Sequence, residues 1–269
     1  MLNNGSAKER MAISQNYMKA YSEVTQSGLV DNKVLQKHVE EYSKIDALLP
    51  NLASFFYIVE PTTRTYHFLG KQQESISGID NNTFINQGVQ AFLERVHPDE
   101  TAILVNEVYL DLYAWFKAIK NQINFSDIFF QYNYRFLNRN GLYINLIEYV
   151  YFLEVDDNDH PSLLLGNVMT SNTIQSRPIK AAMKAFRPNE VVETLFSKTY
   201  GKEISCYELT KRELDILRNL ATGKTSKQIG NQLFISPHTV DTHRRNLLKK
   251  LSCSSVVELA QIAFRNGLL

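Results

Sequence analysis

A row of polar side chains near the C-terminus has the spacing and chemistry to recognise nucleic acid. Asp241, Arg245 and Lys249 stand four residues apart, which places them on one face of a helix. Thr242 lies beside them and adds a hydroxyl group to a mostly basic face. A helix that presents such a row outward is a candidate for the major groove of DNA.

The same stretch carries the signals of a helix with one buried side. Ser236 can accept a hydrogen bond from an amide of the first turn, and Pro237 suits the first helical position because it has no N–H to satisfy. Val240, Leu247 and Leu251 repeat at helical spacing and form one apolar stripe. We therefore expect the helix to pack by this stripe and to expose its polar row.

Three further helices are predicted around it. Thr210 and Glu213 match a capping box that begins a helix, and Gly223 is a natural stop for that helix. A second helix is expected over about 226–234 and a last one over about 255–266. Four short helices, with the second and third separated by a tight turn, are typical of a helix-turn-helix domain.

This region resembles the LuxR-type helix-turn-helix domain from residue 209 to the last residue. The motifs that carry the resemblance are LTKRE at 209–213, GKTSKQI at 223–229, LFISPHTV at 233–240 and HR at 243–244. The resemblance implies sequence-specific binding to double-stranded DNA, usually as a homodimer.

The resemblance also implies roles for individual residues. Base contacts fall on Asp241, Thr242 and Arg245; many members of the family carry lysine where Asp241 stands, so this aspartate departs from the pattern and could accept from a cytosine amine. The expected phosphate contacts are Lys224, Ser226, Lys227, His238, Thr239, Arg244 and Lys249. The expected dimer contacts on the last helix are Val256, Val257, Leu259, Ala260 and Ala263.

Charge supports a nucleic-acid partner for this end of the chain alone. Residues 207–269 hold ten Lys/Arg and five Asp/Glu, a net charge of +5, whereas the other 206 residues hold 19 and 23, a net charge of −4. Only one domain is therefore expected to meet a polyanion.

Composition describes a chain of two ordinary domains. It has 269 residues, 44% of them hydrophobic and 21% charged, which fits globular domains with apolar cores. The two cysteines, Cys206 and Cys253, have neither the number nor the spacing of a disulfide framework or a metal site. No apolar run reaches the length of a membrane span or a signal peptide, so no membrane partner and a cytoplasmic protein are expected.

Residues 51–172 alternate strand and helix patterns in an order typical of an α+β fold. Strands are predicted over 55–60 and 65–69, helices over 72–77, 82–95 and 99–120, and a three-stranded meander over 128–137, 142–154 and 162–170. This order favours an antiparallel sheet with its helices to one side. Before it, residues 1–50 predict two helices, over 7–27 and from about 31 to 49, that act as a cap, as a dimerisation element or as cover for one sheet face.

The segment 51–172 resembles a PAS domain. The carrying residues are HPDE at 97–100, before the long helix, and YRF at 134–136 with Asn140-Gly141 leading into the next strand. The fold class is therefore α+β: a PAS-like antiparallel sheet with helices, plus an all-α four-helix domain over 207–269. Residues 173–206 are expected to connect the two, with either a hairpin of 179–186 and 191–197 or a helix over 179–186.

We interpret the chain as a transcription regulator whose PAS-like domain senses a signal or mediates dimerisation. Three alternatives for that domain stay open: a solid aromatic core, a pocket for a small organic ligand, and a protein-interaction module without a ligand. No bound cofactor, metal site or catalytic residue is expected, and a small-molecule-modifying enzyme fused to a DNA-binding domain is disfavoured because no phosphate loop, metal cluster or nucleophile motif occurs. RNA polymerase is a further candidate partner.

Overall fold

The chain divides into two compact units. The computed structural model describes residues 28–119, 121–158, 160–171, 178–188, 191–201, 209–251, 253, 255–265 and 268. One unit comprises mainly Asn3–Lys202 and the other mainly Glu203–Leu269. The predicted helix over 7–27 lies outside the described residues. Within the described ranges no helix is long and apolar enough to cross a membrane, and no group of three or more His, Cys, Asp or Glu side chains could hold a metal ion.

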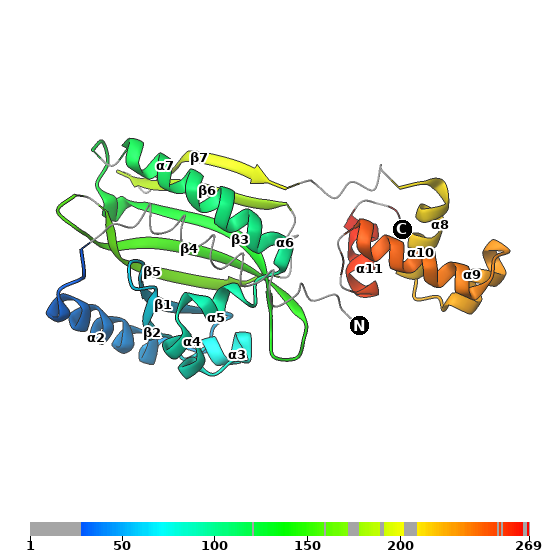
Figure 1. The fold of residues 1–269 in the computed structure, drawn as a ribbon, viewed down its shortest axis with the longest axis horizontal. Coiled ribbons are helices and arrows are strands. Elements are labelled where there is room, and N and C mark those ends of the chain that lie inside the picture. Colours follow the sequence, from blue (N-terminus) through cyan, green and yellow to red (C-terminus); the bar gives the residue numbers. More distant parts are fainter. Residues whose placement is uncertain are drawn as a thin grey trace. The chain divides into compact units, whose positions relative to one another are not determined.

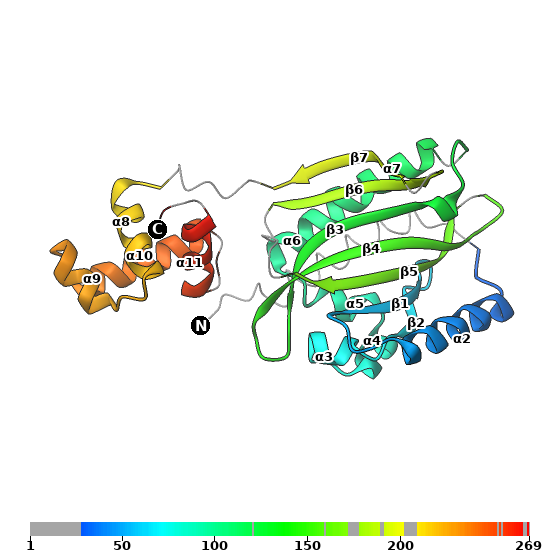
Figure 2. The same cartoon turned by 180° about the vertical axis from the view of Figure 1, so that it is seen from behind.

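The described part of the first unit is built on one seven-stranded antiparallel sheet (Figures 1 and 2). The strands run in the order β2-β1-β5-β4-β3-β6-β7. Their bounds are β1 Ser54–Glu60, β2 Thr65–Leu69, β3 Ile128–Leu137, β4 Tyr143–Val155, β5 Pro161–Thr170, β6 Ile179–Arg187 and β7 Val191–Tyr200. The first five agree with the strands predicted from sequence to within one residue at each end. The antiparallel sheet expected of a PAS-like domain is confirmed.

Strands β6 and β7 correct the view of residues 173–206 as a connector alone. β6 pairs with β3, and β7 pairs back onto β6, so both strands belong to the sheet. Residues 179–187 and 191–200 therefore form the strands of the predicted hairpin, and 179–186 do not form the alternative helix. Ile179 and Met183 on β6 are buried in the core of the first unit.

Short helices between β2 and β3 cover one face of the sheet (Figure 1). They are α3 Gln73–Ser77, α4 Asn81–Gln87, α5 Val89–Leu93, α6 Pro98–Ile103, the π-helical segment Leu104–Val108 and α7 Tyr109–Ile119. Their apolar side chains and those of the facing strands form one continuous core. The long helix predicted over 99–120 thus forms as α6, the π-helical segment and α7 in direct succession.

Gly88 divides the helix that was predicted over 82–95. It has a φ of +61° and separates α4 from α5. A Cβ atom at this position would lie 2.3 Å from the carbonyl oxygen of Arg64. A side chain would be strained and would collide with backbone, so the chain bends here at a residue that only glycine suits.

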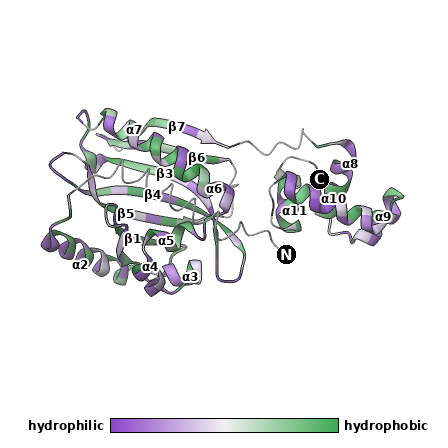
Figure 3. Cartoon of the chain, in the orientation of Figure 1, coloured by the Kyte–Doolittle hydropathy of each residue, from purple (hydrophilic) through white to green (hydrophobic). Residues whose placement is uncertain are grey.

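Helix α2 (Asn32–Leu48) packs on the opposite face of the sheet. Its Leu35 joins a small apolar cluster with Ile58 of β1 and with Leu163 and Leu165 of β5. Hydrophilic and hydrophobic bands both occur along α2 (Figure 3), as expected of a helix with one buried side. The helices between β2 and β3 lie on one side of the sheet, as expected. Helix α2 covers the other face, which is one of the three roles expected of it.

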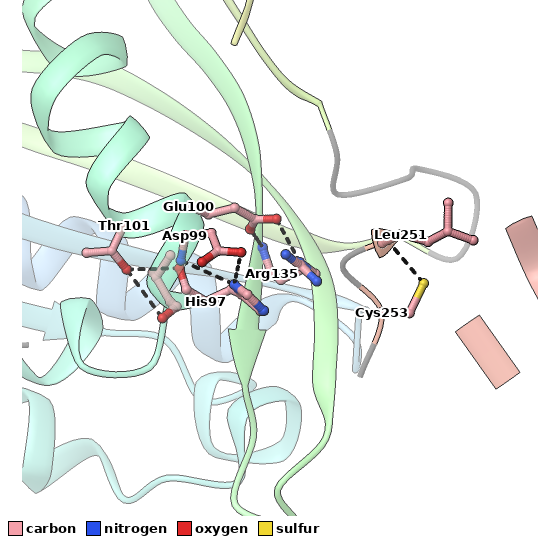
Figure 4. Close-up of polar contacts among 8 residues, drawn as sticks. His97, Asp99, Glu100, Thr101, Arg135, Leu251 and Cys253 are labelled. Carbon is pink, nitrogen blue, oxygen red and sulfur yellow. Dashed lines mark hydrogen bonds and ion pairs between the residues drawn. The ribbon is translucent and has the colours of Figure 1, made fainter. Parts of the chain in front are cut away.

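The two motifs that carry the PAS resemblance meet in a buried ion pair (Figure 4). The Glu100 carboxylate accepts from the Arg135 backbone N–H at 2.6 Å and from its Nε at 2.7 Å. The side chains of Glu100 and Arg135 are 0% and 5% exposed, respectively. The start of α6 is thereby tied to the middle of β3.

The second unit is all-helical in its described residues. It contains α8 Lys211–Ala221, α9 Ser226–Leu233, α10 Pro237–Lys250 and α11 Val256–Arg265. The apolar stripe predicted from Val240, Leu247 and Leu251 is buried in its core, where it meets α8 and α11. The predicted four-helix arrangement is confirmed.

Candidate nucleic-acid interface and internal cavity

Local caps hold α9 and α10 in place. The Thr210 and Glu213 capping box begins α8 as predicted. A second capping box, formed by Thr225 and Gln228, begins α9; sequence reasoning missed it, although the T-x-x-Q spacing was there to find. Ser236 accepts from the Thr239 amide at 3.0 Å and so begins α10.

The turn between α9 and α10 is tight. A Cβ atom at Gly230 would lie 2.7 Å from the carbonyl oxygen of Ile235, so the small residue lets the turn approach α9 closely. Phe234 ends α9 in the left-handed conformation, with a φ of 54°, and is 95% exposed. The two helices are thus held in the close arrangement of a helix-turn-helix.

The three predicted base-contacting residues lie together on the exposed side of α10. Arg245 is exposed, and its Nη2 lies 3.4 Å from the Thr242 Oγ1. The Asp241 carboxylate accepts from the Ser226 hydroxyl at 2.6 Å and lies 3.6 Å from Arg244 Nη2. In the free domain Asp241 therefore ties α10 to the beginning of α9, a role that the sequence did not reveal.

The predicted phosphate contacts surround this row. Lys227, His238 and Lys249 are exposed, whereas Ser226, Thr239 and Arg244 are half-buried. Lys224 is half-buried too, because its Nζ donates to Asn219 at 2.8 Å and to Gln232 at 2.6 Å. The basic groups with free access are thus those on α10 and on the first turn of α9.

Two of the five residues predicted as dimer contacts on α11 are buried inside the domain. Leu259 and Ala263 are fully buried in the domain core and cannot meet a second chain. Val257 is 67% exposed, and Phe264, which sequence reasoning omitted, is 74% exposed. These two residues stand seven apart and share a face, so the apolar surface of α11 is centred on them, with Val256 and Ala260 half-buried.

A cavity of about 100 Å³ lies in the first unit between the sheet and its helices. Half of its 24 lining residues are aromatic. The interior is therefore not a solid aromatic core. Ring pairs such as Tyr57 with Tyr66 and Tyr109 with Tyr132 meet edge to face at 5.3 and 5.6 Å between centroids.

A buried carboxylate, Glu148 of β4, lies at this cavity. It is 3% exposed and accepts hydrogen bonds from the hydroxyl groups of Tyr57, Tyr132 and Tyr134. Burial raises the pKa of the Glu148 carboxyl above its ordinary value, and the three tyrosine hydrogen bonds oppose that rise. Burial together with this carboxylate also holds the pKa of each tyrosine well above its usual range.

Gly166 of β5 makes the Tyr57 contact possible. A Cβ atom at this position would lie 2.0 Å from the Tyr57 ring. The Tyr57 ring, which comes from β1, therefore crosses directly over β5 to reach Glu148 on β4. A glycine inside a strand often marks such a close approach.

Comparison with known proteins places the C-terminal domain. Residues 207–263 match the family model for bacterial regulatory proteins of the luxR family. The chain is 37% identical over 126 residues to the transcriptional regulatory protein LiaR of Bacillus subtilis. This match covers 42% of this chain and 59% of LiaR. The chain is also 50% identical over 60 residues to the uncharacterized response regulatory protein YgeK of Escherichia coli. This second match covers 22% of this chain and 41% of YgeK.

Two solved structures are similar to larger parts of the chain. One is the N-terminal domain of a diguanylate cyclase with PAS/PAC sensor from Marinobacter aquaeolei, with 20% identity, a TM-score of 0.34, and coverage of 44% of this chain and 94% of that one. The other is a Vibrio cholerae VqmA–ligand–DNA complex, with 13% identity, a TM-score of 0.30, and coverage of 85% and 87%.

The capped, tightly joined α9 and α10 on a four-helix core define the second unit as a helix-turn-helix domain. With the family match, this domain is a LuxR-family helix-turn-helix domain. The first unit has the antiparallel sheet and covering helices of a PAS-like fold. The chain spans about three fifths or less of the length of the two curated relatives named above.

Proposed function

We propose that this chain is a sequence-specific DNA-binding transcription regulator whose PAS-like unit senses a small molecule and controls the helix-turn-helix domain. The observation that carries the proposal is the exposed row on α10, with Arg245 beside Thr242 and the basic groups around it. The cavity beside Glu148 supports sensing over a purely protein-binding role. Such a regulator acts in the cytoplasm as a homodimer on double-stranded DNA, with RNA polymerase as a further partner.

Arg245 and Lys227 should fail in different ways when each is replaced by alanine. Arg245→Ala should lower the ratio of specific to non-specific binding about 10- to 100-fold, because a bidentate guanine contact contributes ~1–3 kcal/mol of discrimination. Lys227→Ala should weaken binding to all sequences alike and lower the salt slope by about one, because it removes one phosphate contact. Fluorescence anisotropy against a genome-mapped operator and a scrambled duplex, at several salt concentrations, measures both.

Lys44→Ala is the matched control for these variants. It removes one exposed charge from α2, in the unit that carries no predicted DNA contact. Neither the ratio of specific to non-specific binding nor the salt slope should therefore change. An unchanged ratio in Arg245→Ala would refute the assignment of Arg245 as a base reader.

The exposed face of α11 should hold two domains together on DNA. Phe264→Asp should weaken binding to an operator with two half-sites, spaced about one helical turn apart, at least tenfold, because a charge would enter an apolar contact. Binding to a single half-site should stay within twofold. Leu29→Asp is the matched control, since Leu29 is also 74% exposed but lies in the other unit. Equal affinity of Phe264→Asp and the parent chain for the two-half-site operator would contradict the assignment.

A further inference from the structure

The cavity contains a buried carboxyl group that is paired with no basic side chain among the described residues of its lining. Glu148 is 3% exposed, and of the described residues that line the cavity none is Lys, Arg or His. A buried carboxylate without a counter-ion is costly. The tyrosine hydroxyl groups hydrogen-bond to this carboxyl group but bring no positive charge to it.

The three tyrosine hydroxyl groups on Glu148 can offer only acceptors to a ligand. A tyrosine hydroxyl has a single proton, and in Tyr57, Tyr132 and Tyr134 that proton is directed to Glu148. Their oxygen lone pairs remain as acceptors. Gln73 adds another acceptor: its Nε2 donates to Ser77 at 2.7 Å, whereas its buried Oε1 has no hydrogen-bond partner. A ligand that brings donors therefore fits this centre better than one that brings acceptors.

The walls of the cavity favour a cation with a compact apolar body. Aromatic rings present a negative face that attracts ammonium groups, most strongly where water is excluded. The volume of about 100 Å³ is below the ~150 Å³ of an engineered cavity that binds benzene. The occupant is accordingly a molecule of few heavy atoms.

From these observations the geometry points to a small protonated amine, with its ammonium group on Glu148 and its apolar body against the aromatic rings, as the ligand of this cavity. The inference rests on the proposed sensing function and names the ligand class for it. The ammonium group supplies both the missing counter-ion and the missing hydrogen-bond donors, which a neutral or anionic molecule of the same shape would not.

Isothermal titration calorimetry on the full chain at pH 7 tests the inference with matched ligand pairs. The probes are isobutylamine against isobutanol, and propylamine against propanol, so that each pair differs in charge at nearly constant shape. We expect the better-fitting amine to bind at least tenfold more tightly than its alcohol. In Glu148→Gln this ratio should fall to about one.

Two further variants separate charge from packing. Glu94→Gln removes an exposed carboxylate outside the cavity and should leave the ratio unchanged. Tyr132→Phe removes one hydroxyl group from the site but keeps the Glu148 carboxyl group, so the amine should bind less tightly than to the parent chain and should still bind more tightly than its alcohol. Near-UV circular dichroism reports whether each variant is folded; if Glu148→Gln is not, the parent chain and Tyr132→Phe decide the question.

Three results would overturn the inference: an alcohol that binds as tightly as its amine, an unchanged ratio in folded Glu148→Gln, or no binding of either amine at millimolar concentration. Anisotropy with operator DNA on the same preparations keeps the two proposals apart. If the parent chain binds operator DNA specifically but binds no amine, only the ligand class is refuted. If the parent chain does not bind operator DNA specifically, the proposed function itself is refuted.

Discussion

Arg135→Ala should lower the free energy of unfolding of the first unit by about 3–5 kcal/mol, the range for removing one partner of a buried ion pair. The Glu100 carboxylate would keep its place at 0% exposure but would lose its charged partner at 2.7 Å. The backbone N–H of residue 135 would still donate to it, but a neutral backbone amide does not replace the charge of the guanidinium. Urea unfolding followed by tyrosine and tryptophan fluorescence measures the loss.

Arg187→Ala is the control for this change. Its Nε also lies 2.7 Å from a carboxylate, that of Glu193, but the two side chains are 37% and 50% exposed. Exposed pairs of this kind contribute ~0–1 kcal/mol, so the control should lose less than about 1 kcal/mol. Similar losses in both variants would show that burial of the Glu100–Arg135 pair does not set its contribution to stability.

Gly166→Ala is expected to cost about 1–3 kcal/mol, the usual range for adding atoms where a core side chain already lies. The added Cβ atom would fall 2.0 Å from the Tyr57 ring, so the ring must leave its place over β5 and the Tyr57 hydroxyl must release Glu148. The same variant should bind any cavity ligand more weakly.

A double-mutant cycle identifies the cause of that cost. In a Tyr57→Ala background the ring is absent, so adding Gly166→Ala should cost less than about 0.5 kcal/mol. The difference between the two backgrounds is the coupling energy of residues 57 and 166. A coupling energy near zero would mean that the cost of Gly166→Ala does not arise from the Tyr57 ring.

Features encoded by neighbouring residues were predictable from the sequence. The capping box at Thr210, the Ser236 cap and the Val240 stripe each depend on residues three to eleven positions apart, and all three occur as expected. The strands β1 to β5 were predictable for the same reason, since alternating side chains and the Asn140-Gly141 turn mark them locally.

Features that depend on distant residues were not predictable. The β6 sequence, IKAAMKAF, is rich in alanine and suits a helix as well as a strand; its pairing with β3 decides the outcome. Gly88 breaks its helix because of Arg64, 24 residues earlier. The cluster on Glu148 joins Tyr57 of β1 with two tyrosines of β3, and only the sheet order brings them together.

The side of α11 that faces the core was also not predictable from the sequence. Its sequence, VVELAQIAF, places apolar residues on more than one side, so periodicity alone does not tell which side meets the core. Packing against α8 buries Leu259 and Ala263 and leaves Val257 and Phe264 outside.

The pairing of β1 with β5 has a consequence for how the chain is made. Phe55 pairs with Val168, so the β1–β2 hairpin, which ends at Leu69, has no neighbour on its β1 side until about a hundred further residues have been translated. At ~5–20 residues per second this interval lasts roughly 5–20 s. During it the apolar side chains of β1 are without their partners on β5. The helix-turn-helix domain, whose contacts lie within about 60 residues, has no comparable delay on the ribosome.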